Sequence, residues 1–134
     1  MDQHIIDELR NLVNICEFRT LALQKAAEHL KVPVAAQFLQ DHAQESQIFA
    51  DELLHLLLSM GVTSDVPEYD DICIPDINDR TYHGVISWCA KQEQTVCAYY
   101  SAVLDKVLPQ HIRSIIQGHL EQINRANSML FKSI

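Results

Sequence analysis

The stretch Tyr82–Val107, YHGVISWCAKQEQTVCAYYSAVLDKV, carries the pattern that decides the fold. Every third or fourth residue of this stretch forms a line that is apolar except for a carboxylate near its centre: Tyr82, Ile86, Cys89, Glu93, Val96, Tyr100, Val103 and Val107. This period predicts an amphipathic helix. A carboxylate on a buried line is unfavourable unless a partner group or a bound ion compensates its charge. Glu93 therefore raises the first functional question.

The composition predicts a single helical domain that spans residues 1–134. Hydrophobic residues make up 48% of the 134 residues and charged residues 21%, which is typical of folded proteins rather than disordered ones. Three glycines and four prolines are few for the many turns of an all-β fold. The formal net charge of -8 argues against nucleic acid or an anionic membrane as a partner, because no basic surface is left to contact phosphates.

The sequence favours a reduced, cytoplasmic protein. The N-terminal residues lack the basic segment and the apolar run of a signal peptide. The most apolar run, LLHLLLSMGV, contains His55 and is too short to span a bilayer. The four cysteines, Cys16, Cys73, Cys89 and Cys97, show no CxxC spacing, and three of them lie in helical patterns, where a free cysteine behaves as a small buried hydrophobe.

The pattern of apolar residues predicts four helices. We expect the first at about residues 2–30 and the second at 33–60, with Pro33 in its first turn and Gly61 as its stop. The third begins near Asn78 or Asp79, either of which suits a helix cap, and continues to about residue 106. The fourth starts at Pro109 and continues to the end of the chain.

The connector between the second and third helices predicts the topology. Its residues 62–78 contain two prolines and no helical period, so they read as a loop. Such a segment reaches about 55 Å when extended, whereas a 28-residue helix is about 42 Å long. The connector can therefore cross the whole bundle, which gives two antiparallel hairpins in the ferritin-like arrangement. A simple up-down bundle is the alternative.

Polar residues interrupt the apolar lines at mid-height in both hairpins. Residues at equal distance from a turn face each other, so we expect six side chains to approach one central layer: Thr20, Gln44, Gln47, Glu93, Glu121 and Asn124. Bundles of this kind can hold two metal ions with a Glu from each of two helices and a Glu-x-x-His pair from each of the other two. Here the layer offers two carboxylates and no histidine, which is a poor set of ligands for iron or manganese. We therefore favour a hydrogen-bonded polar layer over a di-metal site.

Two other histidine–carboxylate pairs have the spacing of metal ligands. Glu52 and His55 form a literal Glu-x-x-His, but it lies about two turns away from the central layer. His42 and Glu45 show the reversed spacing and are expected on the outer flank of the bundle. We interpret both pairs as surface residues, and we expect His119 at the surface or at a helix end as well.

The chain resembles a ferritin-like family of bacterial proteins of unassigned function. The resemblance covers nearly the whole chain and rests on four segments: ICEFRTLALQKAAEHL, FADEL, WCAKQEQTVCAYYSAVL with the following Leu108-Pro109, and HLEQINRAN. It implies a four-helix ferritin-like bundle in which the metal site is degenerate or absent. In that family, Glu93 and Glu121 match acidic positions, Thr20 replaces a commonly acidic residue, and Asn127 stands where a histidine is usual.

The sequence thus predicts a non-enzymatic ferritin-like bundle with a structural or interaction role and no cofactor. The alternative is a metal-binding or iron-handling protein that holds iron, manganese or zinc through Glu93 and Glu121, with help from His42, Glu45 or His119. A second apolar line on the second helix predicts self-association, most simply as a dimer. That line consists of Phe38, Phe49, Leu53, Leu56 and Met60.

Overall fold

Four helices make up the bundle in the computed structural model, which describes residues 3–62 and 72–131. They are α1 (Gln3–Glu28), α2 (Pro33–Ser59), α3 (Tyr82–Leu104) and α4 (Gln110–Phe131). The ends of α1, α2 and α3 lie within two residues of the expected ones, and α4 reaches Phe131, beyond which the chain lies outside the described residues. The starts of α1, α2 and α4 lie within one residue of expectation, whereas α3 starts later than expected. There the N-cap is Thr81, not Asn78 or Asp79, because the Thr81 side chain accepts a hydrogen bond from the Gly84 backbone N–H.

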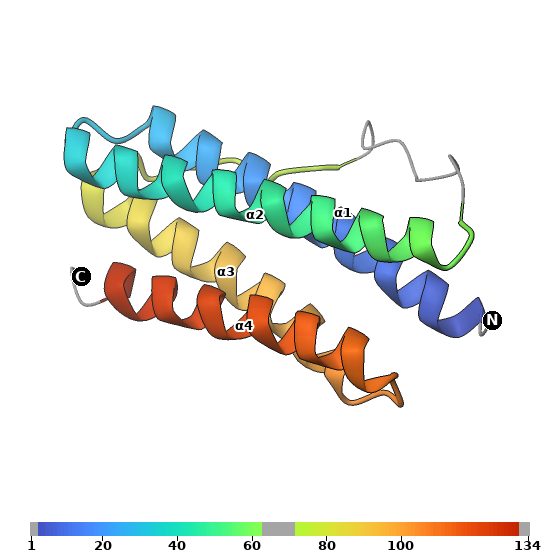
Figure 1. Cartoon of the computed structure of the whole chain (residues 1–134). Coiled ribbons are helices and arrows are strands. Elements are labelled where there is room, and N and C mark those ends of the chain that lie inside the picture. The colour runs from blue at the N-terminus through green and yellow to red at the C-terminus, as the bar shows by residue number, and fades with distance from the viewer. Residues whose placement is uncertain (1–2, 63–71, 132–134) are drawn as a thin grey trace.

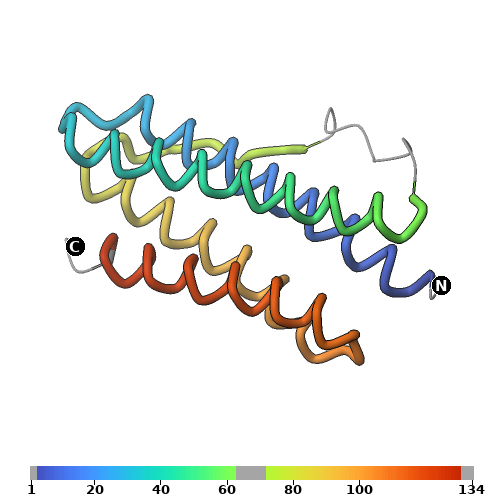
Figure 2. Tube along the Cα trace, in the orientation of Figure 1, coloured from blue at the N-terminus to red at the C-terminus, as the bar shows by residue number. Residues whose placement is uncertain are grey.

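The topology is the ferritin-like one (Figure 1). The antiparallel pair α1 and α2 lies beside the antiparallel pair α3 and α4, and α3 begins at the end of the bundle opposite to the end of α2. The described part of the connector, residues 72–81, follows α1 (Figure 2). Lys25 of α1 holds it by a hydrogen bond to the Pro75 carbonyl (3.2 Å), and Ile77 is buried. The connector is therefore the expected long crossover; its residues 63–71 lie outside the described residues.

A belt of polar side chains divides the core into two apolar clusters. The larger cluster lies toward the N-terminus of α1 and includes Leu9, Phe49 and Ile116. The smaller one lies toward the turn between α1 and α2 and includes Leu23 and Ile86. Between them lie five buried polar side chains that we call the polar belt: Arg19, Thr20, Ser46, Gln92 and Glu93. Hydrophobic packing alone does not require such a layer, so these residues are candidates for a functional site.

Helix packing leaves one side of the bundle more open than the others. α1 and α2 share the most extensive contact, whereas α2 and α4 approach each other at few positions. A groove of about 340 Å³ lies on this side and is lined by Asp41, Gln44, Glu45, Ile48, Phe49, Glu52 and Gln122. Within the described residues, no helix has both the length and the apolar character needed to cross a membrane.

Candidate functional site

The buried carboxylate of Glu93 is paired with Arg19. The Arg19 Nε donates to both carboxylate oxygens of Glu93, at 2.9 and 3.2 Å. Both side chains are almost completely buried, with 1% of Arg19 and 2% of Glu93 exposed. A charge-assisted hydrogen bond of this kind is stronger than a neutral one and compensates the buried negative charge. Glu93 is therefore compensated by Arg19, which was not among the six residues expected in the central layer.

Arg19 also reaches the edge of the bundle through Glu45. Its Nη1 donates to Glu45 Oε1 at 3.1 Å, and His42 Nδ1 lies 3.4 Å from the same oxygen. Burial by itself raises the pKa of Glu45, but the contact with His42 and the charge of Arg19 outweigh it and lower that pKa. Burial likewise disfavours the charge of Arg19, but Glu93 and Glu45 together outweigh this effect, so the pKa of Arg19 is raised. Both groups stay charged at neutral pH.

Two hydroxyl groups complete the polar belt by binding one backbone carbonyl. Thr20 Oγ1 and Ser46 Oγ both donate to the carbonyl oxygen of Cys16, at 2.9 and 2.8 Å. The Thr20 hydroxyl also lies 3.4 Å from the Ala43 carbonyl. Thr20 is thus buried in the belt as expected, but it joins α1 to α2 instead of approaching Glu93.

A second buried network links all four helices through side chains. The Tyr100 hydroxyl lies 3.1 Å from Cys16 Sγ and 3.1 Å from His119 Nδ1. His119 Nε2 lies 3.2 Å from Glu52 Oε2, and its ring stacks on Phe49 with centroids 4.1 Å apart. We call Cys16, Tyr100, His119 and Glu52 the relay. Its outer end is Glu52, whose side chain is 49% exposed and lines the groove between α2 and α4.

The acceptor at the outer end fixes the direction of the hydrogen bonds in the relay. An ionised carboxylate only accepts, so the hydrogen on His119 must be on Nε2 and point to Glu52. Burial lowers the pKa of His119, which keeps the imidazole neutral despite the opposing effect of Glu52. Nδ1 of a neutral imidazole with its hydrogen on Nε2 accepts, so the Tyr100 O–H donates to it. The Tyr100 oxygen then accepts from the Cys16 S–H.

The inner groups of the relay are neutral at physiological pH. Burial raises the pKa of the Cys16 thiol to about 12, although Tyr100 and Arg19 act in the opposite direction. Burial also raises the pKa of Tyr100 above its ordinary value. A thiol with so high a pKa is a weak nucleophile, because the thiolate is the reactive species. The relay therefore holds Cys16 as a neutral thiol and does not activate it for attack.

Besides Thr20, four members of the expected central layer are not brought together with Glu93. Glu121, Asn124 and Gln44 are exposed, and Gln47 is half-buried. The reason lies in the rotation of α4 about its own axis: Ile116, His119 and Ile123 form its buried line, and Glu121 points away from that line. Counting residues from the turn gave the height of Glu121 but not its direction, so the expected convergence of the two carboxylates is wrong.

The two histidine–carboxylate pairs behave differently from each other. His55 is exposed, and its Nδ1 lies 2.8 Å from the Asp51 carbonyl oxygen, while Glu52 turns to His119 instead. Glu52 and His55 therefore do not face one ion together. His42 and Glu45 are in contact, but the Arg19 guanidinium occupies the same carboxylate oxygen. The expectation that His119 lies at the surface is wrong, since only 3% of it is exposed.

The side chains of the belt do not fit a di-metal centre. Both oxygens of Glu93 already accept from a guanidinium, and a divalent cation placed there would meet a buried positive charge. The described residues contain no group of three or more His, Cys, Asp or Glu side chains arranged to hold a metal ion. What the arrangement does show is ion pairing in the belt and a chain of hydrogen bonds along the relay.

The sequence signals for the missed residues were present but ambiguous. Arg19 lies on the apolar line of its helix beside Thr20, and His119 falls three residues after Ile116 and four before Ile123. Either position is compatible with burial. What the sequence lacks is the partner, because Glu93 lies 74 positions from Arg19 and Glu52 lies 67 from His119.

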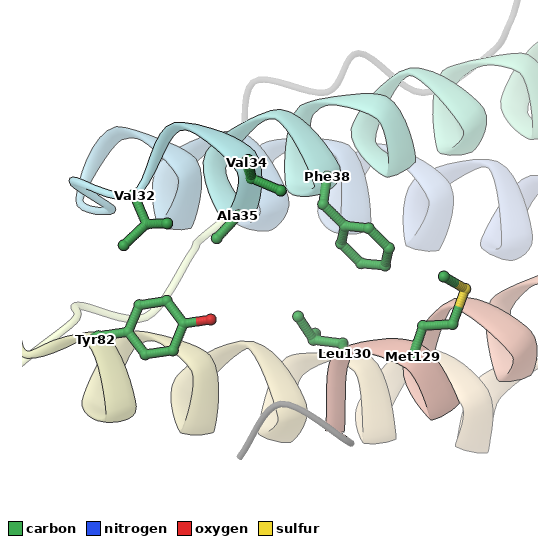
Figure 3. Close-up of a pocket in the computed structure, with 7 residues that line it drawn as sticks. All are labelled: Val32, Val34, Ala35, Phe38, Tyr82, Met129 and Leu130. Carbon is green, nitrogen blue, oxygen red and sulfur yellow. The ribbon is translucent and has the colours of Figure 1, made fainter.

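An apolar hollow lies at the other end of the bundle, near the turn between α1 and α2 (Figure 3). It has a volume of about 280 Å³ and is lined by Val32, Val34, Ala35, Phe38, Tyr82, Met129 and Leu130. In Figure 3, Phe38 points from α2 toward Met129 and Leu130 of α4. The described residues that line this hollow offer no carboxylate, amine, imidazole or thiol, and apart from the Tyr82 hydroxyl they present apolar surface.

The fold matches that of a solved structure, a mutant of Dps1 from Mycobacterium smegmatis. The TM-score is 0.86 at 10% sequence identity, and the match covers 98% of this chain and 95% of that chain. No family model and no curated protein matches the sequence. At this level of identity the match establishes the fold: an all-α four-helix bundle of the Dps and ferritin type with a long loop between α2 and α3. The ferritin-like resemblance of the sequence is thereby confirmed as a fold.

Proposed function

We propose that the protein is a self-associating ferritin-like bundle with a structural or interaction role, in which an ion pair takes the central place that metal ions occupy in di-metal bundles. The single observation that supports this is the double hydrogen bond from Arg19 to the two oxygens of Glu93. Metal binding at Glu93 requires that both bonds break and that Arg19 remain buried without its main partner. The ion pair is the more favourable state.

Self-association is supported by the exposed apolar residues of α2. Val34, Ile48 and Leu58 are 81%, 53% and 59% exposed. They replace the line expected from the sequence, because Phe49 and Leu53 are buried inside the monomer. Four free thiols suit a reducing compartment, and we place the protein in the cytoplasm on that basis.

The alternative is an iron-handling protein that uses Glu93 and Glu121. It requires Arg19 to leave Glu93 and the exposed Glu121 side chain to turn inward from α4. The first change leaves Arg19 buried without its main partner, and the second moves a carboxylate out of water. Both are unfavourable. No observation favours this alternative over the ion pair.

Metal analysis of the untagged protein tests the proposal. The protein is incubated with Fe(II), Mn(II) or Zn(II), passed over a desalting column and measured by elemental mass spectrometry, together with Glu93→Gln and with Glu121→Gln as the exposed carboxylate control. We expect substoichiometric metal in all three proteins. One or more ions per chain that disappear in Glu93→Gln would overturn the proposal in favour of the metal-binding alternative.

A further inference from the structure

The relay surrounds one phenol with the groups that a reversible loss of an electron and a proton requires. Tyr100 is fully buried, yet its hydroxyl has a base, His119 Nδ1, at 3.1 Å. Behind that base, His119 Nε2 lies 3.2 Å from Glu52, which opens on the groove between α2 and α4. The direction of the hydrogen bonds, from Tyr100 to His119 and from His119 to Glu52, already points outward along the path that a departing proton would take.

We propose that Tyr100 is a redox-active tyrosine whose proton exit is His119 and Glu52. A strong one-electron oxidant, such as the azidyl radical, takes one electron from the phenol and leaves as its reduced anion. The phenolic O–H breaks, and its proton forms an N–H bond at His119 Nδ1, while the Nε2 proton of His119 passes to the Glu52 carboxylate. The products are a neutral phenoxyl radical, a neutral imidazole and a protonated Glu52.

Electrostatics explains why a buried tyrosine needs an acceptor for its proton if it is to be oxidised. Oxidation of a phenol without loss of its proton would leave a positive charge in the apolar interior, which is strongly unfavourable. Transfer along the relay keeps Tyr100 and His119 neutral and puts the charge change on Glu52, whose side chain is half exposed. The buried part of the protein therefore gains no net charge during the step.

Other described tyrosines lack this arrangement. Tyr82 and Tyr99 are 41% and 49% exposed, and neither makes a hydrogen bond to a base within residues 3–62 and 72–131. Tyr99 is the direct neighbour of Tyr100 on the same helix, so it is a matched control for the position in the chain. We expect the radical to reside on Tyr100, where the surrounding protein shields it from solutes.

The inference is independent of the proposed function. Arg19 and Glu93 are not members of the relay, and no member of the relay accepts a hydrogen bond from Arg19. If the protein binds metal at Glu93, the argument for Tyr100 is unchanged. If Tyr100 forms no radical, the argument for the ion pair is unchanged. The two ideas are therefore tested by separate measurements.

Pulse radiolysis with azide tests the proposal on the full chain. The azidyl radical is generated in solutions of the wild-type protein, Tyr100→Phe, Tyr99→Phe and His119→Gln, and the tyrosyl radical is followed by its absorption and by electron paramagnetic resonance after freezing. We expect the radical in the wild type and in Tyr99→Phe and its loss in Tyr100→Phe. In His119→Gln an amide can accept the hydrogen bond but not the proton, so we expect formation to slow by about a hundredfold.

Two further measurements keep the test decisive. Formation in D2O should be slower than in H2O for the wild type, because a proton moves with the electron. If Tyr100→Phe does not fold, the triple variant Tyr69→Phe, Tyr82→Phe, Tyr99→Phe leaves Tyr100 as the sole tyrosine of the four in the chain. Full retention of the radical in that variant supports the proposal. Loss of the radical there, its loss in Tyr99→Phe, or an unchanged rate in His119→Gln would overturn it.

Discussion

A buried arginine between two acids is the residue that sets the character of this bundle. Arg19 bonds Glu93 inside the core and Glu45 at its edge, so one positive charge is shared between two negative ones. Its remaining nitrogen, Nη2, is buried and has no hydrogen-bond partner among the described residues. Removal of water from these groups is unfavourable, and the geometry of the pair compensates it. Replacement of both partners by apolar side chains is therefore expected to cost little stability, whereas removal of one partner is expected to cost much.

Arg19→Ala is predicted to destabilise the protein strongly. It leaves the Glu93 carboxylate buried without a partner, which lowers the free energy of unfolding by about 3–5 kcal/mol. Urea unfolding followed by circular dichroism measures the loss. The double variant Arg19→Met, Glu93→Met removes both charges and is expected to recover most of it. If Arg19→Ala unfolds at the wild-type urea concentration, the pair does not carry the charge compensation described above.

Two buried thiols predict a loss of stability at alkaline pH. Burial raises the pKa of Cys16 and of Cys89 from 9.0 to about 12. The unfolded chain therefore releases these protons first, so stability is fully present below pH 9 and declines as the pH rises toward 12. Each thiol removes about 1.4 kcal/mol for each pH unit above 9.

Unfolding in reducing buffer at pH 8 and at pH 10 measures this effect. The double variant Cys16→Ala, Cys89→Ala is less stable at both values because of the cavities it creates, but its decline between them should be smaller than that of the wild type. Cys73→Ser changes an exposed thiol and should keep the wild-type decline. An equal decline in the wild type and the double variant would contradict the prediction.

At the scale of the element, α3 begins with a compact network that fixes its first turn. Asp79 Oδ1 accepts from the Thr81 backbone N–H and from the Thr81 hydroxyl, at 3.1 and 2.7 Å. The Thr81 hydroxyl oxygen accepts in turn from the Gly84 N–H at 3.1 Å. Two residues of the crossover thus satisfy backbone groups of the helix that follows. This arrangement sets where α3 starts and hence the height of Glu93.

The two helical glycines are predicted to respond in opposite ways to alanine. A Cβ at Gly84 would meet the Asp79 side chain and, at 2.5 Å, its backbone oxygen, so Gly84→Ala should lower the free energy of unfolding by about 1–3 kcal/mol. A Cβ at Gly118 meets nothing within 4 Å, so Gly118→Ala should raise it by about 0.5–1 kcal/mol. Urea midpoints of the two variants check this. An unchanged or raised midpoint in Gly84→Ala would show that the start of α3 is not held as described, and a lowered midpoint in Gly118→Ala would contradict the prediction for α4.

At the scale of the whole molecule, the sequence predicted those features of the core that depend on the spacing of residues along one helix or loop. The expected line is buried from Ile86 to Val103 as its period indicated, whereas its two ends, Tyr82 and Val107, are exposed. The length of the connector predicted the crossover correctly (Figure 1). The position of Glu93 on that line predicted its burial. These features follow from local spacing, which a sequence displays directly.

The composition of the candidate site depends on long-range geometry, and the sequence did not determine it. Glu121 could be assigned a height but not a direction, because the direction depends on how α4 turns on α3. An arginine side chain can either reach solvent or pair with an acid inside the protein. Which of these Arg19 does depends on an acid from the other hairpin, Glu93. His119 was hidden for the same reason: its partners Tyr100 and Glu52 belong to two other helices.

The association of whole chains gives the last prediction. Ile48 and Leu58 are exposed on α2, and burial of one such side chain against a partner is worth about 1.5–3 kcal/mol. We expect the wild type to elute as a dimer at micromolar concentration when its mass is measured by light scattering after size exclusion. The double variant Ile48→Glu, Leu58→Glu should elute as a monomer with unchanged helical content, because both side chains lie outside the core. Val107→Glu, at a 92% exposed position beyond the end of α3, is the matched control and should remain dimeric. The prediction is contradicted if the wild type is monomeric at these concentrations. It is also contradicted if the Ile48→Glu, Leu58→Glu variant remains a dimer, because α2 then does not form the contact between chains.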